Sequence, residues 1–325
     1  MTFSADQLLD KVNTYLATMP YMREPKGLYA PIEYVLSIGG KRIRPVLMLL
    51  SYQLYKENAD DILSQAAGIE TYHNYTLLHD DLMDRADMRR NKPTVHKVWD
   101  ENTAILSGDA MLVLAYRLMN NCPEGYLKQV MDIFSQTALE ICEGQQWDME
   151  FETRNDVTVS EYIEMIRLKT SVLLSAALKI GAVLGNASED DAQKLYDFGI
   201  KMGLAFQLQD DFLDVYGDPK LFGKNIGGDI LCNKKTFMLI NALALADGQQ
   251  REELEKWISR TDFHPEEKIK AVTELYNKIG IGGICEEEIN ACYAEGLSLL
   301  ESVAIPSERK EELKSFVCHL MNRKM

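Results

Sequence analysis

The sequence predicts a single all-α domain, and three observations support this. Apolar residues recur at spacings of three and four along nearly the whole 325-residue chain, which is the period of an amphipathic helix. Runs of β-branched residues bounded by turn signals, the usual sign of strands, are missing. No Pro/Ser-rich linker or low-complexity tract divides the chain. We therefore expect a single domain covering residues 1–325.

Breaks in the periodicity place the individual helices. A Gly-Gly pair interrupts the second apolar stretch, and Pro45 suits the first turn of the helix that follows. Ser160 is a candidate N-cap for a helix that ends at Gly185. The predicted helices cover residues 4–18, 29–38, 46–55, 62–88, 102–119, 126–150, 161–184, 188–214, 237–245, 265–279, 286–302 and 307–322, with loops at 91–98 and 217–235.

Composition restricts the possible partners and the compartment. The net charge of −15 comes without a basic stripe, which argues against binding of nucleic acid. Six scattered cysteines without a CxxC pair suit a reduced, cytoplasmic protein. The N-terminus has no basic-then-apolar run, and no apolar stretch reaches the roughly 20 residues of a membrane span. Neither a signal peptide nor a membrane helix is expected.

The first chemical signal is a DDxxD motif formed by Asp80, Asp81 and Asp84. If the helix continues through the motif, these carboxylates lie about one turn apart on one face. Like charges at that spacing repel, so a cation is expected between them. Mg²⁺ is the candidate, because it binds one or two carboxylates together with substrate phosphates. The alternative is an acidic helix face in water.

The same spacing recurs at Asp210, Asp211 and Asp214, after an apolar run. A carboxylate buried in such a helix must be paired or bind a metal. We interpret the two motifs as facing aspartate clusters with a metal-bound diphosphate between them. Two unrelated exposed turns are the alternative.

Positive charges near the first motif suggest a second anion site. The glycine pair before Lys41 allows backbone amides to approach an anion, and Lys41 and Arg44 add charge. His73 lies two helical turns before Asp80, and Arg90 follows the motif. A helix-capping loop with solvated cations and a core histidine would give the same pattern.

Further cations accompany the second motif. Lys169 and Thr170 lie within an apolar stretch, where the lysine can point at a phosphate or snorkel to solvent. Lys224 and Lys234 lie in the 217–235 loop, which would suit a lid over a diphosphate. Two acidic clusters and two groups of cations indicate two diphosphate substrates, and metal-assisted departure of diphosphate as the chemistry.

These motifs resemble the trans-isoprenyl diphosphate synthases (polyprenyl synthetases), in particular the short-chain farnesyl and geranylgeranyl diphosphate synthases. The resemblance covers nearly the whole chain. It is carried by Gly-Gly-Lys-Arg-Ile-Arg-Pro at 39–45, the DDxxD motifs at 80–84 and 210–214, Arg89-Arg90, Lys169-Thr170, Gln207, and Lys224 before Gly-Gly-Asp. It implies an all-helical isoprenoid synthase bundle around a central cavity, and a homodimer.

The resemblance also implies roles for individual residues. Three Mg²⁺ ions, or Mn²⁺, would be held by Asp80, Asp81, Asp84, Asp210, Asp211 and Asp214. The catalytic residues would be Asp80, Asp81, Asp84, Lys169, Asp210 and Asp211. The allylic diphosphate would contact Arg89, Lys169, Thr170, Gln207, Lys224 and Lys234. Isopentenyl diphosphate would contact Lys41, Arg44, His73 and Arg90. Ionisation would leave an allylic cation, the isopentenyl double bond would attack it, and diphosphate would accept the released proton.

Two residues depart from the family pattern. Asn91 and Asn233 stand where the family usually or often has glycine. Asparagine tolerates positive φ better than most residues. We therefore expect both loops to keep their conformation.

Product length is predicted from the residues just before the first motif. Tyr72, Tyr75 and Thr76 lie one to two turns before Asp80 and would form the floor of the cavity. In the family, an aromatic residue five positions before the motif shortens the product, and a second adjacent one shortens it further; here the neighbour is the small Thr76. This favours geranylgeranyl diphosphate (C20), with farnesyl diphosphate (C15) as the alternative. The tyrosines could instead only pack against a neighbouring helix.

Three other functions fit the sequence less well. A class I terpene cyclase needs no isopentenyl site, so the cations assigned to that site argue against it. A non-catalytic subunit of a heteromeric synthase would lack one of the two motifs. A di-iron bundle needs two Glu-x-x-His motifs, and Glu70 with His73 supplies only one.

Overall fold

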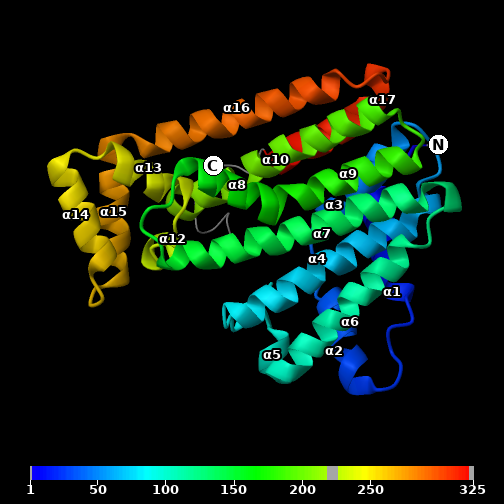
Figure 1. Cartoon of the computed structure of the whole chain (residues 1–325), viewed down its shortest axis with the longest axis horizontal. Helices are drawn as coiled ribbons and strands as arrows, with labels where there is room; N and C mark the ends of the chain where they lie inside the picture. Colours follow the sequence, from blue (N-terminus) through cyan, green and yellow to red (C-terminus); the bar gives the residue numbers. More distant parts are fainter. Residues whose placement is uncertain (1, 218–225, 322–325) are drawn as a thin grey trace. The chain divides into compact units, whose positions relative to one another are not determined.

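The computed structural model describes residues 2–217 and 226–321, and the described chain is helical apart from one short hairpin (Figure 1). This confirms the all-α prediction. The helices are α1 Ala5–Thr18, α2 Lys26–Ser37, α3 Ile43–Gln53, η1 Ala59–Ile62, α4 Leu63–Met83, α5 Val95–Val98, α6 Glu101–Met119, α7 Glu124–Thr153, α8 Val159–Ile166, η2 Arg167–Ser171, α9 Val172–Leu184, α10 Glu189–Tyr216, α12 Gly228–Leu231, α13 Phe237–Leu245, α14 Gly248–Ser259, α15 Pro265–Ile279, α16 Ile281–Glu301 and α17 Ser307–Met321.

The structure differs from the sequence prediction at several helix boundaries, and α5, α12 and α14 were not predicted. The helix predicted to reach residue 88 ends at Met83, because Arg85 adopts φ 51° and turns the chain away. Thr158, not Ser160, is the N-cap of α8, in a capping box closed by Glu161. Helix α14 was not predicted, although the capping box of Asp247 marks its start. Its mostly polar sequence hid its periodicity.

A two-stranded hairpin follows the first motif, where no strand was expected. Strands β1 Met88–Arg89 and β2 Lys92–Pro93 pair antiparallel. The turn residues Arg90 and Asn91 have φ values of 51° and 61°, as a type I′ turn requires. The expectation that Asn91 tolerates positive φ is thus confirmed, and Asn233 with φ 54° behaves likewise.

The chain divides into two compact units. The first contains Met1–Ser135, Ala176–Leu195 and Val303–Lys314, and the second contains Gln136–Ser175, Tyr196–Ser302 and Ser315–Met325. The first DDxxD motif belongs to the first unit and the second motif to the second unit. A single domain spanning the chain stays a prediction.

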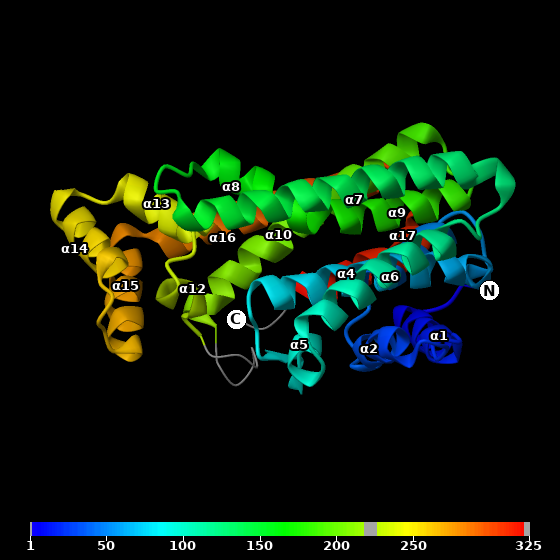
Figure 2. The same ribbon diagram turned by 60° about the horizontal axis from the view of Figure 1, so that its bottom comes forward.

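In the first unit, α4 packs closely along α6 (Figure 2). Two glycines allow this approach: a Cβ on Gly68 would lie 3.2 Å from the Ala115 carbonyl, and one on Gly108 would collide with the His79 ring at 2.1 Å. This packing fixes the last two turns of α4, which carry the first motif.

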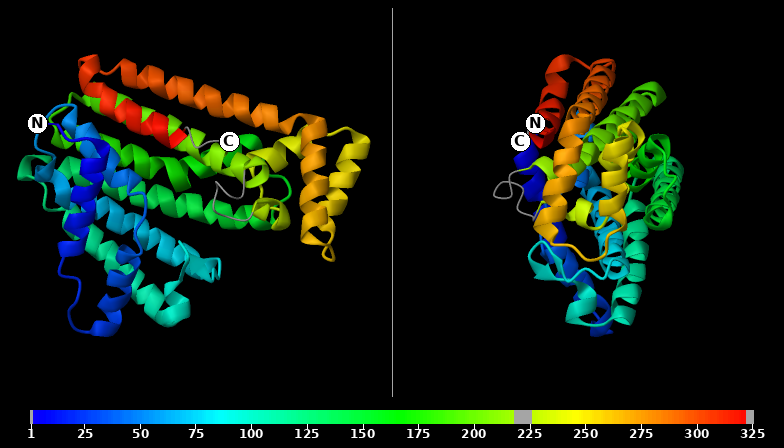
Figure 3. Two further views of the ribbon diagram at one scale, coloured as in Figure 1. Left: turned by 180° about the vertical axis from the view of Figure 1, so that it is seen from behind. Right: turned by 90° about the vertical axis from the view of Figure 1, so that its left-hand side faces the viewer.

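In the second unit, a π-helical turn, η2, interrupts the helix predicted over 161–184. Gly144 of α7 and Gly203 of α10 both lie against it, since a Cβ would be 2.4 Å from Lys169 N and 2.6 Å from Ser171 Cα, respectively. Such π-turns often occur at functional sites. Helices α14 and α15 pack side by side (Figure 3).

Among residues 2–217 and 226–321, we find no helix with the length and apolarity needed to cross a membrane.

Candidate active site

The first aspartate motif lies at the C-terminal end of α4. Asp80 and Asp81 belong to the last helical turn, and Asp84 is the residue that caps the helix. The backbone then folds back, with Ala86 N donating to the Asp81 carbonyl at 2.9 Å. The three aspartates thus lie at one helix end, with Asp84 just outside the helix.

Arg89 is bound to this motif. Its Nη2 and Nε lie 2.6 Å and 3.0 Å from Asp81 Oδ1, and the Asp81 carboxylate is buried. A guanidinium with two donors fixes a carboxylate in orientation as well as in charge. Arg89 therefore neutralises Asp81, the same residue that is predicted to hold a metal.

The cations predicted to bind isopentenyl diphosphate gather in the first unit. Arg44 Nη1 donates to His73 Nε2 at 3.1 Å. Arg90 Nη1 donates to the Gly39 carbonyl, and a Cβ on Gly40 would touch its guanidinium at 2.7 Å. The glycine at position 40, with φ 151°, thus lets the hairpin arginine lie against the loop. Lys41, in the same loop, is exposed.

Histidine 73 is held in its neutral form. Burial lowers its pKa well below the usual value, and Arg44 and Arg90 lower it further by repulsion. Because a guanidinium can only donate, the bond to Arg44 requires an unprotonated Nε2. His73 therefore presents Nδ1–H as a donor while the arginines supply the positive charge.

The sequence analysis missed the network beneath these cations. Arg42, between Lys41 and Arg44, points inward and binds Glu70 at 2.7 Å, with both side chains buried. It also donates to the Leu36 carbonyl at 2.7 Å, and Asn74 Nδ2 donates to Glu70 Oε1 at 2.9 Å. Because Glu70 is occupied by this network, the di-iron alternative loses its glutamate.

In the second motif, a hydroxyl and an amide donor bind the Asp211 carboxylate. Asp211 is 3% exposed and accepts hydrogen bonds from the Tyr162 hydroxyl and from Gln207 Nε2, the latter at 3.1 Å. Thr170 Oγ1 in turn donates to Gln207 Oε1 at 3.2 Å. The predicted residues Thr170, Gln207 and Asp211 therefore form one chain of hydrogen bonds. Tyr162, which is buried, had no signal in the sequence beyond its place in an apolar helix.

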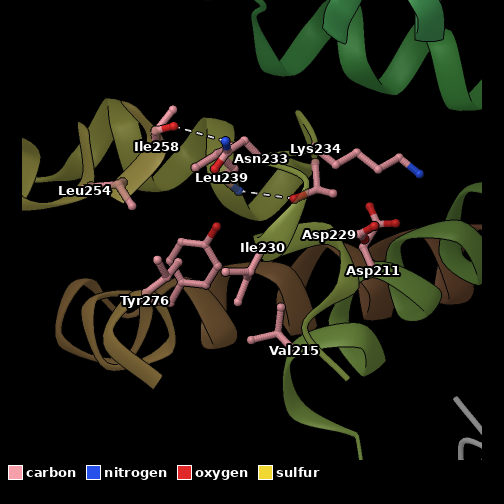
Figure 4. Close-up of a pocket in the computed structure, with 12 residues that line it drawn as sticks. Asp211, Val215, Asp229, Ile230, Asn233, Lys234, Leu239, Leu254, Ile258 and Tyr276 are labelled. Atoms are coloured by element: carbon pink, nitrogen blue, oxygen red, sulfur yellow. Dashed lines mark hydrogen bonds between the residues drawn. The ribbon is translucent and has the colours of Figure 1, made fainter. Parts of the chain in front are cut away.

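The electrostatics around Asp211 favour a bound cation. Burial and, to a smaller extent, the nearby Asp229 together raise the pKa of its carboxyl to about 7, although Tyr162, Lys234 and Gln207 act in the opposite direction. Figure 4 shows the Asp211 and Asp229 carboxylates side by side, with Lys234 extending from the neighbouring turn. A cation placed at these oxygens would favour the ionised carboxylate.

Asp214, the third member, anchors the turn that carries Asp229. Its Oδ2 accepts a hydrogen bond from Asp229 N at 3.0 Å, and its carbonyl accepts one from Gly227 N at 2.5 Å. Lys234 N donates to the Asp229 carbonyl at 2.9 Å. The motif and the predicted lysine are thus linked through α12. Lys224, the other predicted lysine of this loop, lies outside the described residues.

Lys169 projects from the π-turn and binds Asp148 Oδ2 of α7 at 2.6 Å. Asp148 lies at the end of the predicted helix 126–150 but was not predicted as a site residue. The extra residue of a π-turn shifts the side chains that follow it, and here it turns Lys169 toward α7. Lys169 therefore points to a carboxylate within the protein, not to solvent.

The predicted cavity floor lies along α4. Tyr72 is 1% exposed and packs edge-to-face on Phe134 with ring centroids 5.3 Å apart. Tyr75 contacts both Tyr72 and His79. Thr76 Oγ1 donates to the His73 carbonyl at 2.9 Å. The three residues form a packed wall, and their role in product length stays a prediction.

The residues of both motifs suit Mg²⁺. Among the described residues, no group of three or more His, Cys, Asp or Glu side chains is close enough to hold a metal by itself. The donors at each motif are carboxylate oxygens, which Mg²⁺ prefers, and it completes its shell with phosphate oxygens and water. That the two motifs face one another across a diphosphate stays a prediction.

Comparison with known proteins gives consistent results. The family model for polyprenyl synthetases matches residues 25–276. A crystal structure of a geranylgeranyl pyrophosphate synthase is 43% identical and superimposes with a TM-score of 0.95 over 100% of both chains. Geranylgeranyl diphosphate synthase of Methanosarcina mazei is 45% identical over 67% of this chain and 68% of its own. A short chain isoprenyl diphosphate synthase of Methanocaldococcus jannaschii is 40% identical over 82% of this chain and 81% of its own.

Fold, motif positions and relatives therefore agree. Enzymes of this family are prenyltransferases that act on isoprenoid diphosphates and generally use Mg²⁺. With its paired aspartate motifs at the ends of two helices and a family match over most of its length, this chain belongs to the polyprenyl synthetase family.

Proposed function

We propose that the chain is a short-chain all-trans prenyltransferase whose main product is geranylgeranyl diphosphate. It condenses isopentenyl diphosphate with dimethylallyl, geranyl and farnesyl diphosphates in turn. The observation that carries this proposal is the near-complete superposition on a geranylgeranyl pyrophosphate synthase at 43% identity. Other relatives are named geranylfarnesyl diphosphate synthases, at 33–37% identity, so the product length needs its own test.

Family membership supports a role for both aspartate motifs in binding Mg²⁺ for the allylic diphosphate. Bound there, Mg²⁺ would neutralise the charge of the departing diphosphate. Arg89 and Lys169 would exchange their present partners, Asp81 and Asp148, for phosphate oxygens. Tyr162 and Gln207 would keep Asp211 oriented throughout, because their bonds come from the interior of the second unit.

The first unit would bind isopentenyl diphosphate through Lys41, Arg44, His73 and Arg90. Replacing Arg90 by Ala should raise the KM for isopentenyl diphosphate at least about tenfold, because a hydrogen bond to a charged group contributes about 1.5–3 kcal/mol. The KM for the allylic substrate should rise less. Steady-state kinetics with each substrate varied in turn measure both values.

Arg117→Ala is the matched control, because Arg117 is an exposed arginine on α6 of the same unit. It should leave both KM values within about twofold, as for a surface change. If Arg90→Ala raised both KM values equally, two separate diphosphate sites would have been assigned where there is one.

Product length can be tested by chromatography of products made from radiolabelled isopentenyl diphosphate with each primer. Farnesyl diphosphate should be extended by one isopentenyl unit, to C20, and no further. Replacing Tyr72 and Tyr75 together by Ala should give products longer than C20, because two rings are removed from the proposed floor. Failure to extend farnesyl diphosphate would favour the C15 product.

Tyr116→Ala is a control for packing. Tyr116 contacts Phe134 from α6 with ring centroids 4.9 Å apart, so its loss disturbs the same aromatic cluster without changing α4. Product length should stay at C20. An unchanged product in the Tyr72/Tyr75 double variant would show that these rings only pack against neighbouring helices.

We further propose a homodimer. Helix α6 exposes Ile105, Leu106 and Val113, each with 44–59% of its surface accessible, and exposed apolar side chains gathered on one helix are typical of interaction surfaces. Sedimentation equilibrium measures the mass of the particle in solution and so distinguishes a dimer from a monomer.

All six cysteines are free thiols, which supports the cytoplasmic setting expected from the sequence.

A further inference from the structure

Lys268 of α15 is a buried lysine to which the proposed chemistry gives no role. Its side chain is 1% exposed. The Nζ donates to Asn233 Oδ1 at 2.7 Å and to the Leu231 carbonyl at 3.3 Å, and it lies 4.4 Å from the centre of the Phe263 ring. A buried ammonium is tolerated only with such partners. The Lys268 ammonium therefore binds the segment at the end of α12 and just after it, through Leu231 and Asn233.

Asn233 extends this attachment to a second helix. Its backbone has φ 54°, and its Nδ2 donates to the Ile258 carbonyl of α14 at 3.1 Å. At the other end of the segment, Gly227 lies directly on α15, since a Cβ there would be 2.6 Å from Ile269 Cδ1. Residues 227–236, which we call the lysine turn, are thus mounted on α14 and α15.

The opposite side of the lysine turn is bonded to the second aspartate motif. Asp214 Oδ2 accepts from Asp229 N, and the Asp229 carbonyl accepts from Lys234 N. Figure 4 shows Asp229, Asn233 and Lys234 on this one short segment next to Asp211. A displacement of the turn would therefore move Lys234 relative to the motif.

We propose that Lys268 is a positioning residue for the transferase, which fixes the lysine turn through Leu231 and Asn233 so that Lys234 is presented beside Asp211. The inference rests on the proposed function, because Lys234 is assigned there to the allylic diphosphate. Lys268 itself touches no substrate. Its effect on binding comes from holding a charged group in one place before the substrate arrives.

The test is Lys268→Met, which keeps the length of the side chain and removes its donors. The matched control is Lys270→Met, two residues along the same helix and exposed. Loss of a supporting contact typically costs about 10–100-fold in metal affinity or activity, so the KM for the allylic substrate should rise at least about tenfold. The KM for isopentenyl diphosphate should change by less than about twofold. Titration calorimetry with inorganic pyrophosphate and Mg²⁺ should show the same loss without turnover.

Asn233→Gly is the second variant. Glycine keeps the positive φ and removes the carboxamide, so the bonds of Asn233 to Lys268 and to the Ile258 carbonyl are lost while Lys268 retains the Leu231 carbonyl. The allylic KM should therefore rise. The Lys268→Met/Asn233→Gly double variant should raise the allylic KM by less than the product of the two single effects, because both changes remove the same Lys268–Asn233 bond, whereas the Asn233 bond to the Ile258 carbonyl is lost only with Asn233→Gly.

A lowered melting temperature with unchanged KM values and unchanged pyrophosphate binding would overturn the inference, and so would an equal rise in both KM values. If Lys268→Met does not fold, Asn233→Gly decides alone, and unchanged allylic KM would overturn the positioning role. A wild-type protein that forms no prenyl product would contradict the proposed function instead. An active wild type with unaffected variants would contradict only this inference.

Discussion

Replacing Asp80 or Asp210 by Ala should abolish most of the prenyl transfer activity. Metal ions that neutralise a leaving group contribute several kcal/mol to transition-state stabilisation, and each 1.36 kcal/mol is a factor of ten in rate. We therefore expect kcat to fall at least about 1,000-fold. Steady-state rates at saturating Mg²⁺ and both substrates measure this loss. The wild type should likewise lose activity when Mg²⁺ is removed with a chelator.

Two nearby aspartates serve as controls. Asp87 follows the first motif but is exposed and pairs with Lys97 at 2.8 Å. Asp190 lies on α10, the helix of the second motif, and pairs with Lys194 at 2.6 Å. Exposed ion pairs contribute little, so Asp87→Ala and Asp190→Ala should stay within about twofold of wild type. A rate near wild type in the Asp80→Ala/Asp210→Ala double variant would refute the metal assignment.

Replacing Arg42 by Met should produce the largest loss of stability among the residues around the site. The change leaves the Glu70 carboxylate buried without its cation and the Leu36 carbonyl without its donor. Breaking a buried ion pair in this way costs about 3–5 kcal/mol. Urea denaturation followed by circular dichroism should show a lower midpoint, while the slope of the unfolding free energy against urea concentration should stay the same.

The comparison with Lys11→Met separates buried from exposed pairs. Lys11 binds Asp60 at 2.8 Å, but its side chain is 27% exposed and that of Asp60 is 46% exposed. Its loss should cost less than about 1 kcal/mol. The Arg42→Met/Glu70→Met double variant should recover part of the loss, because two apolar side chains leave no buried charge unpaired. Equal stability of Arg42→Met and wild type would show that the network does not stabilise the fold.

The sequence by itself determined the helical fold and the identity of the chemical groups. Helical periodicity and the DDxxD spacing are local patterns, encoded within a few residues, so they can be recognised without knowing which helices meet. The same holds for Asn91 and Asn233, whose tolerance of positive φ is a property of the residue type. Boundaries failed where the local signal was weak or overridden, as at Met83, where Arg85 turns the chain after the motif.

Only the tertiary structure decided which charged residues support the site from inside. Arg42 and Arg44 look alike in the sequence, but Arg42 meets Glu70, 28 residues away, whereas Arg44 meets His73. Tyr162 reaches Asp211 across 49 residues, and Lys268 reaches Asn233 across 35. Such pairs depend on how whole helices pack. Burial removes water as a hydrogen-bond partner, so each buried charge must be paired with the group that the packing places next to it.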